Sequence, residues 1–398
     1  MAKHLLAVLV VLGACLLFVH QRVSHAQTGV VTPSTSRPSE RPALDDQAAK
    51  TLATELRTVY SKAVDQWPEP QVDPTAHFTE LGPTPEVKFP EDNPWSQDKA
   101  DLGRQLFFDA RLSGSGQMAC ASCHDPDLGW ADGRTVAFGH ERQALKRNAP
   151  SILNTAFFPH LFWDGRAKTL EEQAQMPLLA LDEMHADEDV ILERLRAIEG
   201  YRQQFKAVFG TEEITFDHIA KAIATFERTV ISRSNKFDAF MNGNPNALSD
   251  SAVRGLHLFR TDARCINCHN GPLFMDGQFH EMGLSHRGRP FEDLGLYEIT
   301  KNPEDSGKFK TPGLRNVTRT EPYMHNGLFE IDPLLMLYNA GMPNPRRRAD
   351  QVDDELFPTK DVLLKPLGLN DQDIEDLKSF LRSLEEPRNR VRPPKLPK

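Results

Sequence analysis

The sequence predicts a mainly α-helical fold of two similar domains with long loops. Three observations support this prediction. Apolar residues recur at helical spacing in several segments, and no segment shows the sustained alternation that is typical of a strand. Residues 103–107 and 255–259 share a Gly-x-x-Leu-Phe pattern, and each segment precedes one copy of the same five-residue motif. The repeat indicates two domains built on one plan.

The repeated motif is Cys-x-x-Cys-His, which is the attachment sequence of c-type haem. In such a site two thiols bond the vinyl groups of the porphyrin, and the histidine that follows reaches the iron. The two copies consist of Cys120, Cys123 and His124, and of Cys265, Cys268 and His269. We therefore predict a mainly α fold of two cytochrome c-like haem domains with long loops, in which two covalently bound haems form part of the cores.

A Cys-x-x-Cys pair also occurs in zinc knuckles and in thioredoxin-like redox sites. Zinc ribbons bring their two halves together over roughly 15–20 residues, whereas most of a domain separates the two copies here. A redox dithiol needs no histidine after it, yet both copies carry one. Four of the five cysteines belong to the motifs and the fifth, Cys15, lies near the N-terminus, so no disulfide framework remains. These features favour haem over zinc.

Residues 1–26 have the features of a secretory signal peptide, with a short basic start, an apolar run over residues 5–19 and a cleavage-like end at Ala26. The run is shorter than the roughly 20 apolar residues that span a bilayer. Residues 12–15 also resemble a lipoprotein signal with Cys15 as the lipid anchor, but the apolar residues 16–19 argue against it. With either leader we expect a periplasmic protein. No other apolar run is long enough to span a membrane.

The remaining segments are predicted in chain order. An N-terminal extension, 27–94, begins with a Ser/Thr/Pro-rich tether, continues with one amphipathic helix over 44–67 and ends in a proline-punctuated stretch. One helix begins near Trp95 and leads to the first motif, and another leads to the second. Further helices are predicted at 170–180, at 190–208 with a stop at Gly210, at 216–231 with Thr215 as cap, and at 370–384 with Asn370 as cap. The length of 398 residues suits two domains, and the net charge of -9 gives no support for nucleic-acid binding.

Several separate motifs occur between and after the haem motifs, at residues 147–150 (RNAP), 162–166 (FWDGR), 309–316 (FKTPGLRN) and 322–327 (PYMHNG). In these motifs and their order the sequence resembles the bacterial dihaem cytochrome c peroxidase family, which includes the methylamine-utilisation enzyme MauG. The resemblance extends from about residue 95 to residue 386. It implies a peroxidatic haem domain at 95–235, an electron-transfer haem domain at 236–388 and a tail at 389–398.

The resemblance implies roles for three residues around the first haem. Trp163 matches the tryptophan that relays electrons between the two haems; by composition alone it would be a buried core aromatic. Gln173 and Glu183 match the pair beside the peroxidatic haem, although without the motif they would be a helix-surface amide and a solvated charge. A carboxylate at this place can take a proton from hydrogen peroxide and return it to the departing oxygen.

Two further positions separate the branches of the family. His140 lies about where the peroxidases carry a histidine that caps the peroxidatic iron in the oxidised state and moves away on reduction of the other haem. MauG-like proteins lack this cap, and His140 is otherwise a solvent-exposed loop residue. The sixth ligand of the second haem is methionine in the peroxidases and tyrosine in MauG. Tyr338 lies nearest the expected place, and Met342 is the competing candidate.

Asn148, Thr320 and Pro322 match the calcium site of the family, which uses one side-chain amide and two backbone carbonyls. Such oxygen donors, completed by water, suit calcium. The alternative is a turn asparagine and two ordinary loop residues.

Together these features predict a periplasmic peroxidase that reduces hydrogen peroxide to water. Its electrons would come from a small donor protein, a cytochrome c or a cupredoxin. The first alternative is a MauG-like oxidase that uses peroxide to oxidise side chains of a partner protein. His140 favours the peroxidase and Tyr338 favours the oxidase. The second alternative is an electron-transfer cytochrome without catalysis, in which Gln173 and Glu183 would have no role.

Overall fold

The structure is a computed structural model that describes residues 39–398. The predicted signal peptide (1–26), Cys15 and the first part of the extension lie outside the described residues. Within residues 39–398 the chain is mainly helical, as predicted, and contains two strands of three residues each. None of the helices in this part of the chain is both long and apolar enough to cross a bilayer.

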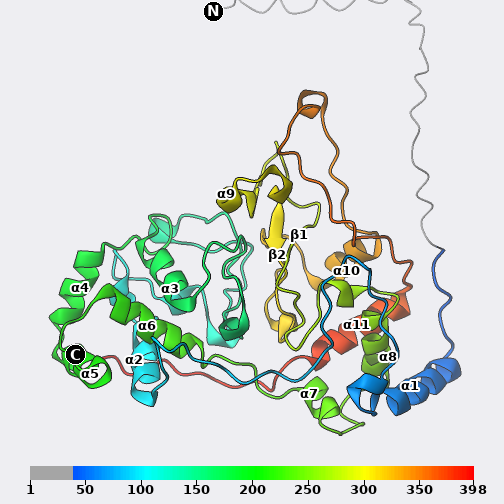
Figure 1. The fold of residues 1–398 in the computed structure, drawn as a ribbon, viewed down its shortest axis with the longest axis horizontal. Coiled ribbons are helices and arrows are strands. Elements are labelled where there is room, and N and C mark those ends of the chain that lie inside the picture. Colours follow the sequence, from blue (N-terminus) through cyan, green and yellow to red (C-terminus); the bar gives the residue numbers. More distant parts are fainter. Residues whose placement is uncertain (1–38) are drawn as a thin grey trace, which may run out of the picture. The chain divides into compact units, whose positions relative to one another are not determined.

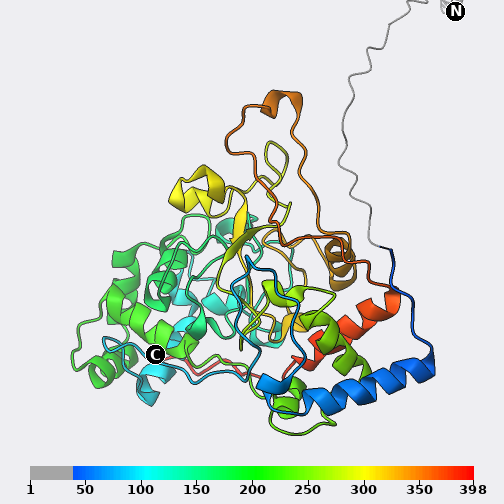
Figure 2. The ribbon, with the colours of Figure 1, turned by 45° about the vertical axis from the view of Figure 1, so that its right-hand side comes forward.

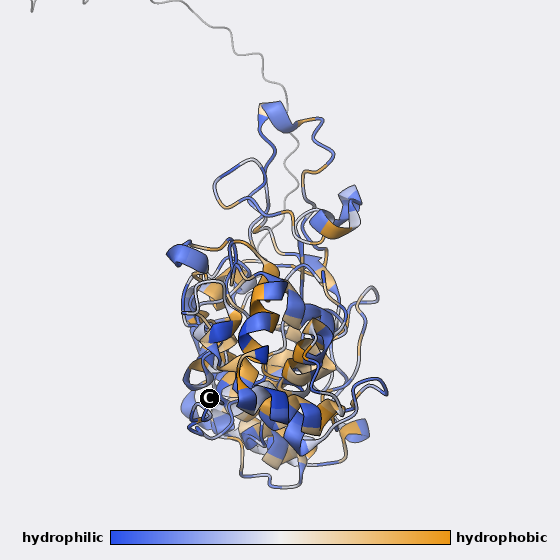
Figure 3. Cartoon of the chain, turned by 90° about the vertical axis from the view of Figure 1, so that its left-hand side faces the viewer, coloured by the Kyte–Doolittle hydropathy of each residue, from blue (hydrophilic) through white to orange (hydrophobic). Residues whose placement is uncertain are grey.

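The first helix group precedes and follows the first haem motif. It consists of α2 (Gln97–Phe107), α3 (Leu170–Leu179), α4 (Glu188–Arg196), α5 (Glu199–Phe209) and α6 (Phe216–Glu227). Helix α2 packs on α6 and α3 packs on α6, and their apolar faces form one core around fully buried leucine, isoleucine and phenylalanine side chains. Figure 3 shows hydrophobic residues gathered between these helices, with hydrophilic residues at the periphery.

The second helix group surrounds the second haem motif. It consists of α1 (Asp46–Tyr60), α7 (Lys236–Met241), α8 (Asp250–Arg260), α10 (Ile331–Asn339) and α11 (Asp371–Ser383). Helix α8 packs on both α11 and α1. A cluster of buried phenylalanines lies at its centre, formed by Phe237, Phe259, Phe274 and Phe380. Figure 1 shows the two helix groups on opposite sides of the described part of the chain.

Both groups contain a pair of helices that cross at the repeated glycine. A Cβ atom on Gly103 of α2 would lie 1.8 Å from the carbonyl oxygen of Ala222 in α6. A Cβ atom on Gly255 of α8 would lie 1.9 Å from the carbonyl oxygen of Asp376 in α11. The two backbones approach too closely for any side chain, which explains why the repeated segments share glycine at this position.

Replacing Gly255 with alanine is expected to lower the free energy of unfolding by about 3 kcal/mol, because α8 must move away from α11 to accommodate the new methyl group. Urea unfolding followed by far-UV circular dichroism measures the change. Gly82→Ala is the matched control, since a Cβ there would meet nothing closer than the Pro272 side chain at 3.7 Å. Equal stability of the two variants would contradict the close crossing.

Two short strands and a short helix lie between the helix groups. Strands β1 (Phe279–Glu281) and β2 (Lys308–Lys310) pair antiparallel, with Phe279 opposite Lys310. Helix α9 (Tyr297–Thr300) belongs to the loop that joins the two strands. Figures 1 and 2 both place the strands between the two groups of helices. This placement brings β2 of the second half of the chain against Trp163 of the first half.

The observed helices confirm most of the predicted ones and correct three. Thr215 and Asn370 cap α6 and α11 as predicted, and each accepts a hydrogen bond from a backbone N–H three residues on. The predicted single helix at 190–208 is wrong, because the extended backbone of Ile198 separates α4 from α5. Helix α6 ends at Glu227 rather than at residue 231. A run of β-branched residues, at 229–231, follows the end of this helix.

The helix predicted at 44–67 is also shorter than expected. It ends at Tyr60, and the hydroxyl of Ser61 donates to the carbonyl of Arg57, 2.7 Å away. A serine that bonds the preceding turn in this way competes with continuation of the helix. The rest of the extension crosses the second helix group, where the side chain of Asn267 donates to the carbonyl of Gln71 at 3.1 Å.

The C-terminal segment crosses from α11 to the first helix group. There the side chain of Arg104 in α2 donates to the carbonyl of Arg392 at 2.6 Å. Figure 1 shows this segment running back beneath the strands toward α2 and α5. The predicted domain boundaries at 95–235, 236–388 and 389–398 remain predictions. The extension that precedes α2 and the segment that follows α11 both contact the two helix groups.

Candidate haem sites

The first haem motif lies on a cavity of about 430 Å³ that Cys120, Cys123 and His124 help to line. The ring of His124 faces the backbone carbonyl of Trp130 through Nδ1, at 3.2 Å. Burial lowers the pKa of His124 to about 4, so the ring is neutral. With Nδ1 occupied by the carbonyl, Nε2 is left to bind a metal, as in other metal-binding histidines.

The second haem motif repeats this arrangement in a separate cavity. Cys265, Cys268 and His269 line it together with many leucine side chains. Nδ1 of His269 lies 3.0 Å from the carbonyl of Phe274, and burial lowers the pKa of this histidine as well. Each motif thus presents two thiols and one imidazole to its cavity, which is the donor set of a c-type haem. The two cysteine pairs line different cavities and cannot form one four-cysteine zinc site.

Trp163 lies between the two cavities. Among the residues that the structure describes, it alone lines both of them. Its Nε1–H donates to the carbonyl of Asn148 at 3.0 Å, and its own carbonyl accepts from the backbone N–H of Lys310 at 2.9 Å. The bond to Asn148 holds the indole against the first half of the chain, and the bond from Lys310 holds the backbone of Trp163 against β2. Both halves of the chain therefore position Trp163.

Gln173 and Glu183 both line the first cavity, and their catalytic roles remain a prediction. Gln173 lies in α3, and Glu183 follows that helix, with its backbone N–H donating to Ala180 at 3.1 Å. The carboxylate of Glu183 lies 3.9 Å from the guanidinium of Arg166. Burial raises the pKa of Glu183, and Arg166 opposes this shift only in part. The structure therefore places an amide and a carboxyl together on the cavity of the first motif.

Arg166 belongs to a series of connected ion pairs that was not part of the predicted site. Arg166 bonds both oxygens of Asp164, which also pairs with Arg147. Arg147 reaches across to Asp293 of the second half, 2.6 Å away. The signal was present in the sequence, because Arg147 begins one matching motif and Arg166 ends another, but only the fold shows that they share a carboxylate.

His140 does not line the first cavity. Its ring stacks on His185, with ring centres 4.3 Å apart, and its backbone N–H donates to the carbonyl of Glu183 at 2.7 Å. The loop that carries His140 is thus bonded to the segment that carries Glu183. The role of His140 as a cap remains a prediction.

Of the two candidate ligands of the second haem, Tyr338 lines the second cavity and Met342 does not. Tyr338 lies in α10, and burial raises the pKa of its phenol. Met342 is buried just beyond the end of the helix, with its backbone N–H bonded to Leu337. A methionine that the sequence reasoning missed, Met282, also lines this cavity. It follows β1 directly, and no motif singled it out.

The three residues expected to bind calcium come together. Asn148, Thr320 and Pro322 line one small cavity between the two haem cavities, of about 110 Å³. The amide nitrogen of Asn148 donates to the carbonyl of Arg134 at 2.7 Å, which leaves its oxygen free to act as a ligand. These neutral oxygens fit calcium. Lys310 also lines this cavity, so a cation bound there would need a nearby anion as well.

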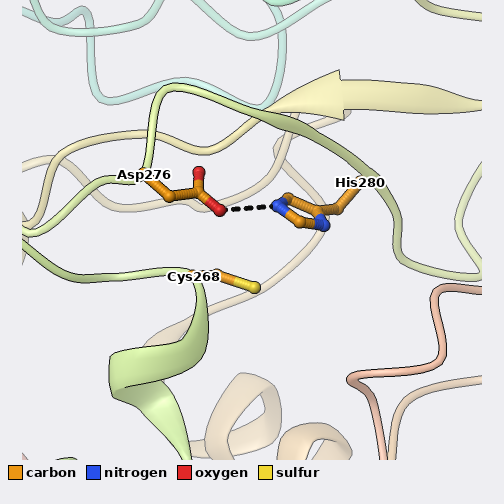
Figure 4. A group of neighbouring side chains, drawn as sticks. All are labelled: Cys268, Asp276 and His280. Carbon is orange, nitrogen blue, oxygen red and sulfur yellow. Dashed lines mark hydrogen bonds and ion pairs between the residues drawn. The ribbon is translucent and has the colours of Figure 1, made fainter. Parts of the chain in front are cut away.

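Cys268, Asp276 and His280 form the cluster shown in Figure 4, whose ligand atoms are close enough to hold a metal ion. Both ring nitrogens of His280 already face carboxylates, Nε2 facing Asp276 at 2.8 Å and Nδ1 facing Asp361 at 2.6 Å. Burial favours the neutral ring, but these hydrogen bonds raise the pKa of His280 to about 12. Since Cys268 belongs to the haem motif, we assign the cluster to the wall of the second haem cavity.

Comparisons with known proteins agree with this geometry. Residues 97–246 match the family described as di-haem cytochrome c peroxidase. The chain is 39% identical to the cytochrome-c peroxidase IdrP1 of Pseudomonas sp. over 334 residues, which cover 76% of this chain and 85% of that protein. It is 38% identical over 315 residues to the methylamine utilization protein MauG of Methylorubrum extorquens, covering 78% of this chain and 85% of MauG.

A solved structure agrees as well. The crystal structure of a MauG-like protein associated with microbial copper homeostasis superposes with a TM-score of 0.68 and 34% sequence identity, covering 76% of this chain and 93% of that one. The likeness extends well beyond the haem motifs, because the match covers about three quarters of this chain.

Proposed function

This chain belongs to the di-haem cytochrome c peroxidase family, and on that premise we propose that it reduces hydrogen peroxide to water at its first haem with electrons relayed from its second. Family membership makes the chain an oxidoreductase with two c-type haems rather than an electron carrier without catalysis. We propose that it works in the periplasm, as its N-terminal residues suggest. Its partners would be peroxide and a small electron-donor protein, a cytochrome c or a cupredoxin.

The two cavities differ in the side chains that line them, and this difference supports the proposal. The first cavity contains the carboxyl of Glu183 and the amide of Gln173, whereas aliphatic side chains dominate the second. Acid–base groups are needed only where the O–O bond breaks. The side chain of Glu183 is 28% exposed, so peroxide and protons can reach it. The second cavity suits a haem that transfers electrons.

The residues present define what the chain contributes to the reaction. Cys120, Cys123 and His124 would hold the first haem, and the second motif would hold the other; when bound, the haems supply the electrons that reduce peroxide. Glu183 takes a proton from the near oxygen of peroxide and returns it to the oxygen that leaves as water. Gln173 orients peroxide by hydrogen bonding, and Arg166 holds the carboxylate of Glu183 toward the cavity.

The main alternative within the family is a MauG-like oxidase that withdraws electrons from side chains of a partner protein. One observation favours it: Tyr338 lines the second cavity and Met342 lies outside it. A tyrosine ligand is the feature that the resemblance assigned to MauG. Calcium binding by Asn148, Thr320 and Pro322 is proposed for either activity, since these residues share the small cavity between the haem cavities.

Stopped-flow absorption spectroscopy distinguishes the two functions. The fully oxidised protein is mixed with one equivalent of hydrogen peroxide without reductant, and the half-reduced protein is treated in the same way. Reaction only after half-reduction, with turnover of peroxide by a reduced donor protein, is expected for the peroxidase and would support His140 as the cap. Rapid absorption changes at both haems of the oxidised protein would indicate the oxidase. No reaction in either state would refute both.

Replacing Trp163 with phenylalanine is expected to slow the oxidation of the second haem by peroxide about tenfold, which corresponds to about 1.4 kcal/mol in the barrier. The indole is the side chain that lines both cavities, and phenylalanine is harder to oxidise. Single-turnover mixing of the fully reduced protein with peroxide measures the rate. Trp95→Phe is the control, because Trp95 is 52% exposed and lines neither haem cavity. Equal rates in the two variants would remove the relay role.

A further inference from the structure

Lys310 is a buried cation whose head group has no carboxylate partner among the described residues. It lies in β2, only 7% of its surface is exposed, and no ion pair in residues 39–398 includes it. The contact made by its Nζ is with the ring of Phe158, whose centre lies 4.5 Å away. The other buried cations among residues 39–398 have polar partners: Arg315 bonds both oxygens of Asp238, and Lys99 bonds the side-chain oxygen of Asn93 and the carbonyl of Pro94. Lys310 is therefore an exception among them.

An unpaired buried charge is costly, so an anion is expected next to Lys310. Burial alone lowers the pKa of Lys310 to about 8, which means that the protein by itself does not stabilise its charge. The side chain lines the second haem cavity and the small cavity beside it. A second polar group of the second haem cavity, the buried Nε2 of His325, also has no hydrogen-bond partner within residues 39–398.

The second haem would bring the missing anion. Porphyrins of c-type haem carry two propionate carboxylates, and a carboxylate is the partner that a buried ammonium group requires. We propose that Nζ of Lys310 forms an ion pair with a propionate of the second haem, and that Nε2–H of His325 donates to the same propionate edge. The inference rests on the presence of two haems and is independent of whether peroxide or a partner protein is the substrate.

This ion pair would lie directly beside the electron relay. The backbone N–H of Lys310 donates to the carbonyl of Trp163 at 2.9 Å, so the residue that binds the propionate also holds the backbone of Trp163. A positive charge next to the second haem favours the reduced iron, because reduction removes one positive charge from the metal. Lys310 is therefore a positioning residue that also raises the reduction potential of the second haem.

The test is a spectroelectrochemical titration of the protein with both haems attached. Lys310→Met is expected to shift the equilibrium of the second haem about tenfold toward the oxidised form, which is 59 mV for one electron. Lys310→Arg keeps the charge and is expected to retain most of the potential. Lys308→Met is the matched control, since Lys308 lies on the same strand but pairs with Asp305 and lines neither haem cavity.

Two outcomes would overturn the proposal. One is an equal potential of the second haem in Lys310→Met and Lys308→Met, and the other is a larger shift in the first haem than in the second. If Lys310→Met does not assemble, resonance Raman spectroscopy of the wild type and Lys310→Arg replaces it. A changed propionate bending band of the second haem is expected in Lys310→Arg, because a guanidinium bonds a carboxylate differently, and an unchanged band would contradict the ion pair.

Discussion

Replacing Glu183 with glutamine is expected to slow peroxide reduction about 10²–10⁴-fold, which is the usual contribution of a general acid–base group. Glutamine is of similar size and keeps its place near Arg166, but its amide cannot take a proton from peroxide. Steady-state turnover with a reduced donor protein measures the loss. Glu193→Gln is the control, because Glu193 is an exposed residue of α4 that does not line the first cavity.

The pH dependence of the same variant gives a second readout. Burial raises the pKa of Glu183, so its carboxylate form, which accepts the proton, is lost as the pH falls through this raised value. The wild type should therefore lose activity on the acid side, and Glu183→Gln should show no such loss. Unchanged turnover in the variant, or an acid limb that persists, would assign the proton transfer to another group.

Replacing Arg315 with methionine is expected to lower the free energy of unfolding by about 3–5 kcal/mol, the usual result of removing one partner of a buried ion pair. The side chain of Arg315 is 1% exposed and bonds both oxygens of Asp238, each at 3.0 Å. It also donates to the carbonyls of Pro272, just after the second haem motif, and of Gly82 in the extension.

Urea unfolding of the protein with both haems attached, followed by far-UV circular dichroism, measures this effect. Arg346→Met provides the comparison, since Arg346 is exposed and forms no ion pair in the described residues. A double variant with Asp238→Asn separates the buried charge from lost packing: removing both charges should cost less than the sum of the single changes. Strict additivity would show that the two side chains contribute independently.

The parts of the site that follow from contiguous residues could be predicted from the sequence. Haem attachment needs five consecutive residues, so both haem sites were evident. The glycine repeat likewise marked the two crossing helices, because only glycine fits the approach seen at Gly103 and Gly255. The break at Ile198 was missed, since apolar residues continue at helical spacing on both sides and the neighbouring glycine, Gly200, lies inside α5 rather than at the break.

The parts that depend on distant residues required the structure. Trp163 owes its place to hydrogen bonds with Asn148 in one half of the chain and Lys310 in the other. The lack of a carboxylate partner for Lys310 among residues 39–398 also depends on the tertiary structure. In the sequence, a lysine between phenylalanine and threonine gives no sign of it. Tyr338 and Met342 lie only four residues apart, and only the folded chain shows that Tyr338 lines the second cavity whereas Met342 does not.

The extension contacts the second helix group, although the first haem motif and its helices lie between the two in the sequence. The side chain of Arg260 in α8 is 1% exposed, and it pairs with Glu80 of the extension, 180 residues earlier. A fragment that starts after the first helix group would therefore leave a buried guanidinium without its carboxylate. A fragment that carries the second haem motif would therefore need residues 39–94 joined to its N-terminus or supplied as a separate complementing peptide.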